Sequence, residues 1–315
     1  MDKVRFGNTS LQVPSLCFGS LTIGPLQAGY SVEKGAKIIC HAFEQGMNFI
    51  DTAELYGTYP HIQKAAEWFP GEFVVSTKSY AYSKEQAVKS LEKARREMAR
   101  DVIDIFMLHE QESAHTLRGH RAALEYYMDE KAKGRIRAVG VSTHFTEVVR
   151  VAAEMDEIDV IHPILNRKGI GIADGSVDDM LEAIRKAHGA GKGIFTMKPL
   201  GGGSLIRDYF QCMAFVRDNP TVHSTAVGIK SMEEARMGIS FFNHEPVDPE
   251  ILGKIALHKR KLHIESWCCN CRECVARCKQ KALRSENGKV MVDASRCALC
   301  GYCISVCPMF AIKIF

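Results

Sequence analysis

The sequence predicts a (β/α)8 TIM barrel, an α/β fold, followed by a small cysteine-rich α+β domain. Three observations support this prediction: eight short apolar runs, longer segments of helical period between them, and nine of the 12 cysteines gathered between Cys268 and Cys307. A single barrel commonly takes about 250 residues. The chain of 315 residues therefore has room for one barrel and a small second domain.

The predicted strands alternate with helical segments along the first three quarters of the chain. The strands are expected at residues 15–19, 47–51, 73–78, 103–109, 138–142, 160–166, 193–198 and 224–228. Apolar residues recur at steps of three and four over residues 32–45, 84–99, 117–133, 177–190 and 233–242, which is the helical period. Repeated strand-helix units favour a closed parallel barrel over an open sheet. No G-x-G-x-x-G follows the first strand, which also weighs against an open dinucleotide-binding sheet.

Three regions are expected on this basis. The barrel spans residues 1–245, residues 246–266 form a helical linker, and the cysteine-rich domain spans residues 267–315. The opening segment VRFGNTSLQV predicts a hairpin that turns at Gly7 and Asn8 and covers the floor of the barrel.

Composition limits the classes of function. The chain is 46% hydrophobic and 25% charged, with a net charge of only +4. It has neither an apolar leader nor an apolar run long enough to cross a bilayer, so we expect no membrane span and a cytoplasmic location. Basic residues in the linker are interpreted as a solvated helix face, or alternatively as a docking site for an acidic electron carrier. No nucleic-acid recognition motif accompanies them, so no nucleic-acid partner is expected.

The cysteine spacing predicts iron-sulfur clusters. The run C-x2-C-x2-C-x3-C occurs twice, at Cys268, Cys271, Cys274 and Cys278, and again at Cys297, Cys300, Cys303 and Cys307. In a reducing cytosol such cysteines hold metal more often than they form disulfides. Zinc is the alternative, because paired C-x2-C motifs suit tetrahedral zinc, but two runs of this kind favour two [4Fe-4S] clusters. Cys17, Cys40 and Cys212 have apolar neighbours and are expected in the core.

The double run resembles the bacterial two-cluster ferredoxin, in which the fourth cysteine of each run binds the other cluster. The resemblance assigns one cluster to Cys268, Cys271, Cys274 and Cys307 and the other to Cys297, Cys300, Cys303 and Cys278. Cys269 is left over. The first run carries Lys279 where the usual proline would stand, whereas Pro308 follows the second run.

Polar residues at the ends of three successive predicted strands form a candidate catalytic group. Asp51, Lys78 and His109 end these strands, and Tyr56 follows Asp51 in FIDTAELYG. Any one of them alone would be interpreted as an ordinary loop or core residue. Together they form a proton-donating unit, because an ammonium beside a phenol lowers the phenol pKa. Asp51 then holds Lys78 in place, and His109 orients a substrate carbonyl.

Several segments resemble the aldo-keto reductase superfamily, in the order found there. They are FIDTAELYG, VVSTK, IDIFMLH, EKAKGRIRAVGVSTH and KPLGGGSL, and the likeness covers about residues 1–245. The resemblance implies that Tyr56 is the general acid and that hydride passes from a nicotinamide to a carbonyl held by Tyr56 and His109. The implied substrate is a small carbonyl compound or alcohol.

The resemblance also places a nicotinamide near the ends of the later strands. The expected contacts with NADPH are Ser142, Asn166, Lys198, Gly228, Lys230, Ser231 and Arg236. The last four lie where a helix begins, and helix N-terminal amides favour a phosphate; the basic residues favour NADPH over NADH. The segment departs from the family pattern, with Val227 in place of a proline and Gly238 or Ser240 in place of an asparagine.

The two parts suggest an oxidoreductase, and the expected oxygen sensitivity of the clusters suits anaerobic metabolism. Hydride carries two electrons, whereas each cluster carries one at a time. The first hypothesis is NADPH-dependent carbonyl reduction, or the reverse, coupled to a ferredoxin or another electron carrier. A flavin would bridge the two regimes; nothing in the sequence indicates one, and it is left open. The alternatives are a ferredoxin-driven reductase that does not use nicotinamide, a nicotinamide-binding redox sensor with little turnover, and clusters that only fold the tail.

Overall fold

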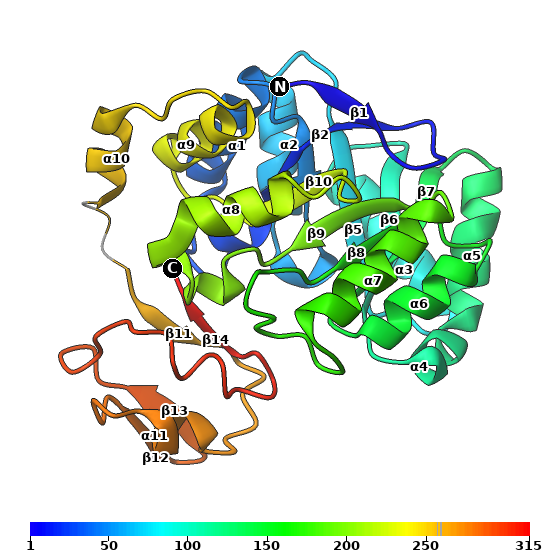
Figure 1. Cartoon of the computed structure of the whole chain (residues 1–315). Helices are drawn as coiled ribbons and strands as arrows, with labels where there is room; N and C mark the ends of the chain where they lie inside the picture. The colour runs from blue at the N-terminus through cyan, green and yellow to red at the C-terminus, as the bar shows by residue number, and fades with distance from the viewer. Residues whose placement is uncertain (257, 259) are drawn as a thin grey trace.

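The computed structural model describes residues 1–256, 258 and 260–315. Eight parallel strands close into a barrel in the order β10-β3-β4-β5-β6-β7-β8-β9 (Figure 1). They are β3 (Leu16–Gly19), β4 (Phe49–Asp51), β5 (Val74–Ser79), β6 (Ile103–Gln111), β7 (Ile136–Thr143), β8 (Val160–Pro163), β9 (Gly193–Met197) and β10 (Ser224–Gly228). All eight lie within or beside the predicted runs, so the barrel prediction is confirmed.

Helices pack around the outside of the barrel. They are α1 (Val32–Glu44), α2 (Tyr59–Trp68), α3 (Lys84–Glu97), α4 (Ala114–Gly119), α5 (Arg121–Ala132), α6 (Thr146–Glu154), α7 (Val177–Gly189), α8 (Tyr209–Arg217) and α9 (Met232–Phe242). Five of them begin at a serine whose side chain accepts a hydrogen bond from the third helical amide, at Ser31, Ser83, Ser113, Ser176 and Ser231. The helix expected at residues 117–133 is divided into α4 and α5 at His120.

The predicted N-terminal hairpin is present and closes the barrel floor. Strands β1 (Lys3–Arg5) and β2 (Gln12–Pro14) pair in antiparallel fashion. Phe6 is fully buried and joins the side chains that fill the barrel interior. Gly7 has a φ of +56°, and a Cβ there would lie 2.4 Å from the backbone nitrogen of Gly193. The turn therefore requires glycine in both conformation and space.

The linker is only partly helical, and the prediction of one helix over residues 246–266 was wrong. Helix α10 covers Pro249–Ala256, while Leu257 and Lys259 lie outside the described residues. Leu262–Ile264 instead form strand β11, which pairs with β14 (Ile312–Ile314) near the C-terminus. The partner strand lies about fifty residues away in sequence, and pairing of that range overrides local helical preference.

Residues 262–315, called the tail below, have the expected mixture of short strands and one short helix. Besides β11 and β14 it contains α11 (Glu273–Arg277) and the hairpin β12 (Leu283–Glu286) and β13 (Lys289–Val292). Figure 1 shows the β11-β14 pair between the barrel and this hairpin. In the described part of the chain, no helix has the length and hydrophobicity needed to span a bilayer.

The tail packs against the glycine-rich loop that follows β9. Gly201, Gly202 and Gly203 all have positive φ angles, and they form the short 3-10 segment η3 (Gly201–Gly203). A Cβ on Gly203 would lie 2.0 Å from the carbonyl oxygen of Ile314, and one on Gly202 would lie 3.1 Å from the ring of Phe310. The GGG sequence of KPLGGGSL is thus the surface on which the tail docks.

Replacement of Gly203 by alanine should loosen the tail. The added Cβ would overlap the backbone of Ile314, which we expect to weaken docking by about 1–3 kcal/mol. The measurement is the rate at which a protease releases the tail from the folded barrel. Gly134→Ala is the matched control, because Gly134 also has positive φ but nothing lies within 4 Å of a Cβ there. Equal cleavage rates in the two variants would contradict the docking role of Gly203.

Candidate active site at the barrel and tail junction

A buried ion pair lies at the centre of the candidate site. The ammonium nitrogen of Lys78 lies 2.7 Å from both carboxylate oxygens of Asp51 and 2.8 Å from the carbonyl oxygen of Thr52. Burial acts to raise the pKa of Asp51, but Lys78 and His162 outweigh it and lower that pKa to about 2. Since Asp51 ends β4 and Lys78 lies near the end of β5, neighbouring parallel strands bring the pair together.

Tyr56 ends the 3-10 segment η2 (Glu54–Tyr56), which directly follows β4. Its ring centre lies 5.2 Å from the Lys78 ammonium. The expectation that Lys78 lowers the pKa of Tyr56 is not met: burial, followed by the charges of Asp51 and Glu110, raises that pKa well above its usual value. The reason is that Asp51 holds Lys78 through both oxygens and so cancels most of its field at the phenol. Tyr56 is therefore protonated at neutral pH.

His109 completes the group of four predicted catalytic residues. Its ring stacks on Tyr80 with 4.4 Å between centres and meets the Tyr56 ring edge-on at 5.9 Å. Burial lowers the pKa of His109 to about 3, so the imidazole is neutral. In the described chain, its Nδ1 atom is buried with no hydrogen-bond partner. A neutral imidazole beside the phenol can donate one hydrogen bond to a substrate oxygen.

His162 is a site residue that the sequence analysis did not single out. It lies in β8, is 1% exposed and places its Nε2 atom 3.7 Å from an Asp51 oxygen. Its Nδ1 atom lies 2.6 Å from the carbonyl oxygen of Phe195, on whose ring it stacks at 3.8 Å. A histidine inside an otherwise apolar strand was the available signal, because a buried polar group needs a partner.

The tail adds two buried charged residues to the same region. Glu265 is 3% exposed, and its carboxylate contributes to the raised pKa of Tyr56. Lys313 lies over the Phe310 ring, 3.4 Å from its centre. The barrel residue Lys198 lies 4.8 Å from the centre of that ring and 2.6 Å from Nε2 of His144. Burial lowers the pKa of Lys198 to about 8. Sequence reasoning gave no indication that the tail reaches these groups.

A cavity of about 590 Å³ is lined by Asp51 and Tyr56 and by the loops that follow β9 and β10. Gly228 and Lys230 line the same cavity. In barrels of this type, the loops after the seventh and eighth strands frequently hold a phosphate, and β9 and β10 are those strands.

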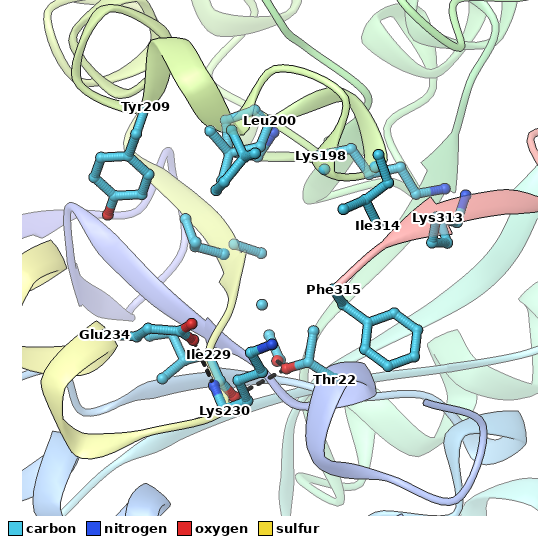
Figure 2. A pocket seen from close by; sticks show the side chains of 18 of the residues that line it. Thr22, Lys198, Leu200, Tyr209, Ile229, Lys230, Glu234, Lys313, Ile314 and Phe315 are labelled. Carbon is cyan, nitrogen blue, oxygen red and sulfur yellow. Dashed lines mark hydrogen bonds between the residues drawn. The ribbon is translucent and has the colours of Figure 1, made fainter. Parts of the chain in front are cut away.

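The tail supplies one wall of this cavity. Figure 2 shows Lys313, Ile314 and Phe315 of the tail on one side of the opening, with Lys230 and Glu234 on another. Arg260, which precedes β11, also lines the cavity. The barrel alone therefore does not enclose the site.

The seven expected nicotinamide contacts are only partly gathered here. Lys198, Gly228 and Lys230 line the cavity, whereas Ser231 lines a smaller neighbouring one. The other three make contacts elsewhere. The Ser142 hydroxyl accepts from the Glu110 amide at 2.9 Å, Asn166 bonds within its own loop to Lys168 and Ile170, and Arg236 donates to His41 at 3.0 Å.

A side chain of α9 itself, that of Glu234, accepts a hydrogen bond at the beginning of this helix. The Lys230 amide donates to the Glu234 carboxylate at 3.0 Å, and the Glu234 amide donates to the Ser231 hydroxyl at 3.2 Å. A carboxylate thus stands where helix amides would attract a phosphate. Lys230 lies close enough to Arg260 and Lys261 for their charges to lower its pKa, after the larger effect of burial. A phosphate bound here would have to displace Glu234.

Cysteines of both runs gather in the tail. Cys274 and Cys303 are buried in one hydrophobic cluster, and the cysteines partly buried against it are Cys268, Cys278, Cys297 and Cys307. Burial, followed by the neighbouring thiols, raises the pKa of Cys274 to about 11. Cys303 has Cys274, Cys300 and Cys297 as its charged neighbours. Cys17, Cys40 and Cys212 are buried in the barrel, as expected, and Cys269 is exposed.

The two runs share a local geometry. The amide of Ala282 donates to the sulfur of Cys278, and the amide of Ala311 donates to the sulfur of Cys307, each at 3.3 Å. Amide donors four residues after a cysteine stabilise a thiolate ligand. Over residues 1–256, 258 and 260–315, no three ligand side chains are placed to hold a single metal ion.

Comparisons with family models agree with both parts of the chain. The model of the aldo/keto reductase family matches residues 15–227, and that of the 4Fe-4S binding domain matches residues 290–313.

Individual relatives are distant. L-galactose dehydrogenase from Arabidopsis thaliana is 22% identical over 211 residues, which cover 63% of this chain and 65% of that protein. The thiosulfate reductase electron transfer subunit PhsB from Salmonella typhi is 32% identical over 83 residues, covering 26% of this chain and 43% of that protein. The chain thus spans less than two thirds of both. An aldo-keto reductase from Bacillus halodurans in its holo form shares the fold, with a TM-score of 0.64, 18% identity, and coverage of 81% of this chain and 95% of that one.

The neutral His109 should make stability depend on pH. Because its pKa is about 3 in the fold and about 6.5 when unfolded, the unfolded chain binds the extra proton as pH falls below 6.5. Lowering the pH from 7 to 5.5 should therefore cost about 1 kcal/mol through this residue. We expect His109→Gln to lose correspondingly less stability than the parent over that interval in denaturant unfolding. Parallel losses in the two proteins would show that His109 is not buried in the neutral form.

Proposed function

Because the chain belongs to the aldo/keto reductase family, we propose that it reduces a small carbonyl compound, or oxidises the matching alcohol, with NADPH as the hydride carrier. Tyr56 is the proposed general acid. Two [4Fe-4S] clusters in the tail exchange electrons with a ferredoxin or another carrier. The proposed setting is the reducing cytoplasm of an anaerobic cell, where cluster cysteines remain reduced.

One observation carries the proposal for the barrel: a single cavity joins Asp51 and Tyr56 to Gly228 and Lys230. An elongated dinucleotide can place its reactive end at Tyr56 and its phosphates near the start of α9. The volume of about 590 Å³ is within the usual range for cofactor sites. The basic residues Lys230 and Arg260 line this cavity and could pair with the phosphates.

The proposed chemistry uses the residues in separate roles. When bound, the nicotinamide supplies a hydride to the carbonyl carbon. Tyr56 donates its hydroxyl proton to the carbonyl oxygen, and its raised pKa keeps that proton in place until the oxygen gains charge. Lys78, held by Asp51, lies beside the phenolate that results. Neutral His109 donates a hydrogen bond to the same oxygen and orients the substrate.

The tail is proposed to handle the electrons one at a time. Its thiols supply eight ligands for two clusters, Cys268, Cys271, Cys274 and Cys307 for one, and Cys297, Cys300, Cys303 and Cys278 for the other. Each cluster holds one electron, so two clusters together match the two electrons of one hydride. Exchange with a nicotinamide hydride would still need a group that passes electrons singly, such as the flavin that the sequence left open.

A second candidate is supported by the contacts of α9. Glu234 accepts from the Lys230 amide just before α9, Asn166 is bonded within its own loop, and Arg236 is bonded to His41. These contacts favour a reductase that receives electrons from reduced ferredoxin through the tail, with Tyr56 supplying protons and no nicotinamide. Reduction of substrate by reduced ferredoxin with NADPH absent would support this candidate, and strict dependence on NADPH would exclude it.

Substitution Tyr56→Phe should abolish carbonyl reduction but leave NADPH binding intact. Loss of a general acid typically costs about 10²–10⁴ in rate, and the phenyl ring preserves packing. The measurements are NADPH consumption with a panel of small aldehydes and ketones, and NADPH binding by fluorescence. Tyr82→Phe is the control, since Tyr82 is 58% exposed and stands apart from the catalytic group. Full turnover by the Tyr56 variant would remove the tyrosine from the mechanism.

Single cysteine substitutions should separate the two clusters. We expect Cys268→Ser and Cys297→Ser each to lower the iron and acid-labile sulfide content by about half, because each removes a ligand from a different cluster. The neighbouring Cys269→Ser should retain the full content. Chemical iron and sulfide assays under anaerobic conditions provide the measurement. Unchanged iron in both ligand variants, or zinc in place of iron, would refute the two-cluster assignment.

A further inference from the structure

The tail has an inner face against the barrel and an outer face toward solvent. On the inner face, Phe310 and Ile314 contact the glycine-rich loop, and Gly301 lies against Ser204. On the outer face, Cys271 and Cys300 are exposed, one from each cysteine run. The outer face is therefore the side from which an external electron carrier can approach the clusters.

Cluster one, at Cys268, Cys271, Cys274 and Cys307, lies toward the catalytic cavity. The Phe310 amide donates to the Cys307 carbonyl oxygen at 3.1 Å, Lys313 lies over the Phe310 ring, and Lys313 lines the cavity together with Tyr56. The ammonium groups of Lys313 and of the barrel residue Lys198 both lie over the Phe310 ring. An electron that leaves this cluster is thus close to the candidate active site.

Cluster two, at Cys297, Cys300, Cys303 and Cys278, is bordered by exposed basic side chains. Arg277 and Lys279 flank Cys278, and Arg296 precedes Cys297; all three are exposed. The Arg277 guanidinium lies 5.6 Å from the centre of the Tyr302 ring, which is 61% exposed. These four side chains, Arg277, Lys279, Arg296 and Tyr302, are called the basic rim below.

Few acidic groups oppose the basic rim. Residues 267–315 contain eight lysine and arginine residues against three acidic ones. Of the acidic residues, Glu286 is paired with Arg284 at 2.6 Å. Asp293 lies beside Arg296, whose amide donates to its carbonyl oxygen at 3.3 Å, and exposed Glu273 precedes Arg277 by one turn of α11, so basic residues remain in excess. Because an iron-sulfur cluster with four thiolates is itself negative, an acidic protein can approach it only where a positive rim offsets that charge.

We propose that an acidic one-electron carrier protein, of the ferredoxin or flavodoxin class, docks on the basic rim and exchanges electrons at cluster two. This inference rests on the proposed two-cluster function. Each encounter moves one electron from the reduced carrier to the tail, with no bond made and no proton transferred. Electrons then reach the barrel through cluster one. Lys279 stands where the ferredoxin pattern has proline, and in this proposal its positive charge helps to bind the acidic carrier.

The rim has the chemistry of a transient electron-transfer contact. Such contacts are small and depend on charge steering more than on buried area. Tyr302 supplies an exposed aromatic surface at its edge, next to the ligand Cys303. Steering by exposed charges raises association rates by one to three powers of ten and weakens with salt.

The test reverses the charge of the rim. The variant carries Arg277→Glu, Lys279→Glu and Arg296→Glu, and the control carries Lys89→Glu, Arg118→Glu and Arg185→Glu, three exposed barrel positions with the same charge change. The probe is a purified acidic bacterial ferredoxin, reduced and mixed anaerobically with the cluster-loaded protein in a stopped-flow instrument. We expect the rim variant to lose at least about tenfold in the second-order rate constant at low ionic strength, with the loss shrinking as salt rises. The control should stay within about twofold of the parent.

Two further readouts keep the outcomes distinct. Binding of oxidised ferredoxin, measured by calorimetry, should weaken in the rim variant, while reduction by methyl viologen, a small cation, should not slow. Arg296→Gln alone should give a several-fold effect if the triple variant does not fold.

Equal rate losses in the rim and control variants, or no loss in either, would overturn the docking surface. If that happens while the parent carries two clusters and reduces carbonyls, the proposed function survives. A parent that binds no clusters would refute both proposals.

Discussion

The contact between Gly203 and the backbone of Ile314 determines how the tail lies on the barrel. A side chain on Gly203 would overlap the Ile314 carbonyl oxygen at 2.0 Å, so the approach is possible only with glycine. The contact places Lys313, Ile314 and Phe315 along the wall of the catalytic cavity. It also places Phe310, whose amide donates to the Cys307 carbonyl oxygen at 3.1 Å, against Gly202 of the same loop. The candidate site of the barrel and the cysteine-rich tail are therefore neighbours because of one glycine-rich loop.

Burial then controls the charges at this junction. The Asp51 and Lys78 pair is nearly self-neutralising, since both carboxylate oxygens contact the ammonium. Tyr56 consequently keeps its proton, and His109 stays neutral. A phenol that keeps its proton beside a neutral imidazole is the arrangement that the proposed general acid catalysis requires. The tail carboxylate Glu265 adds to this effect, because its charge also raises the pKa of Tyr56.

Sequence reasoning predicted what depends on local pattern. Alternating apolar runs identified the barrel strands, and their polar ends identified Asp51, Lys78 and His109, because parallel strands bring their ends to one face. It failed where distant segments meet. Strand β11 was expected as helix because its partner β14 lies at the other end of the tail. The roles of Gly203 and Arg260 and the placement of Arg236 against His41 likewise depend on contacts between separate elements, which no local pattern encodes.

If the tail completes the cavity of the barrel, a nucleotide bound there should contact both parts of the chain. The most direct measurement is hydrogen-deuterium exchange of the cluster-loaded protein with and without saturating NADP⁺, analysed by mass spectrometry of peptides. We expect slower exchange at two separate places together, residues 228–236 at the start of α9 and residues 310–315 at the end of the tail. Protection of the barrel peptide alone would show that the tail is not a wall of the site, and the absence of any protection would contradict the nicotinamide assignment itself.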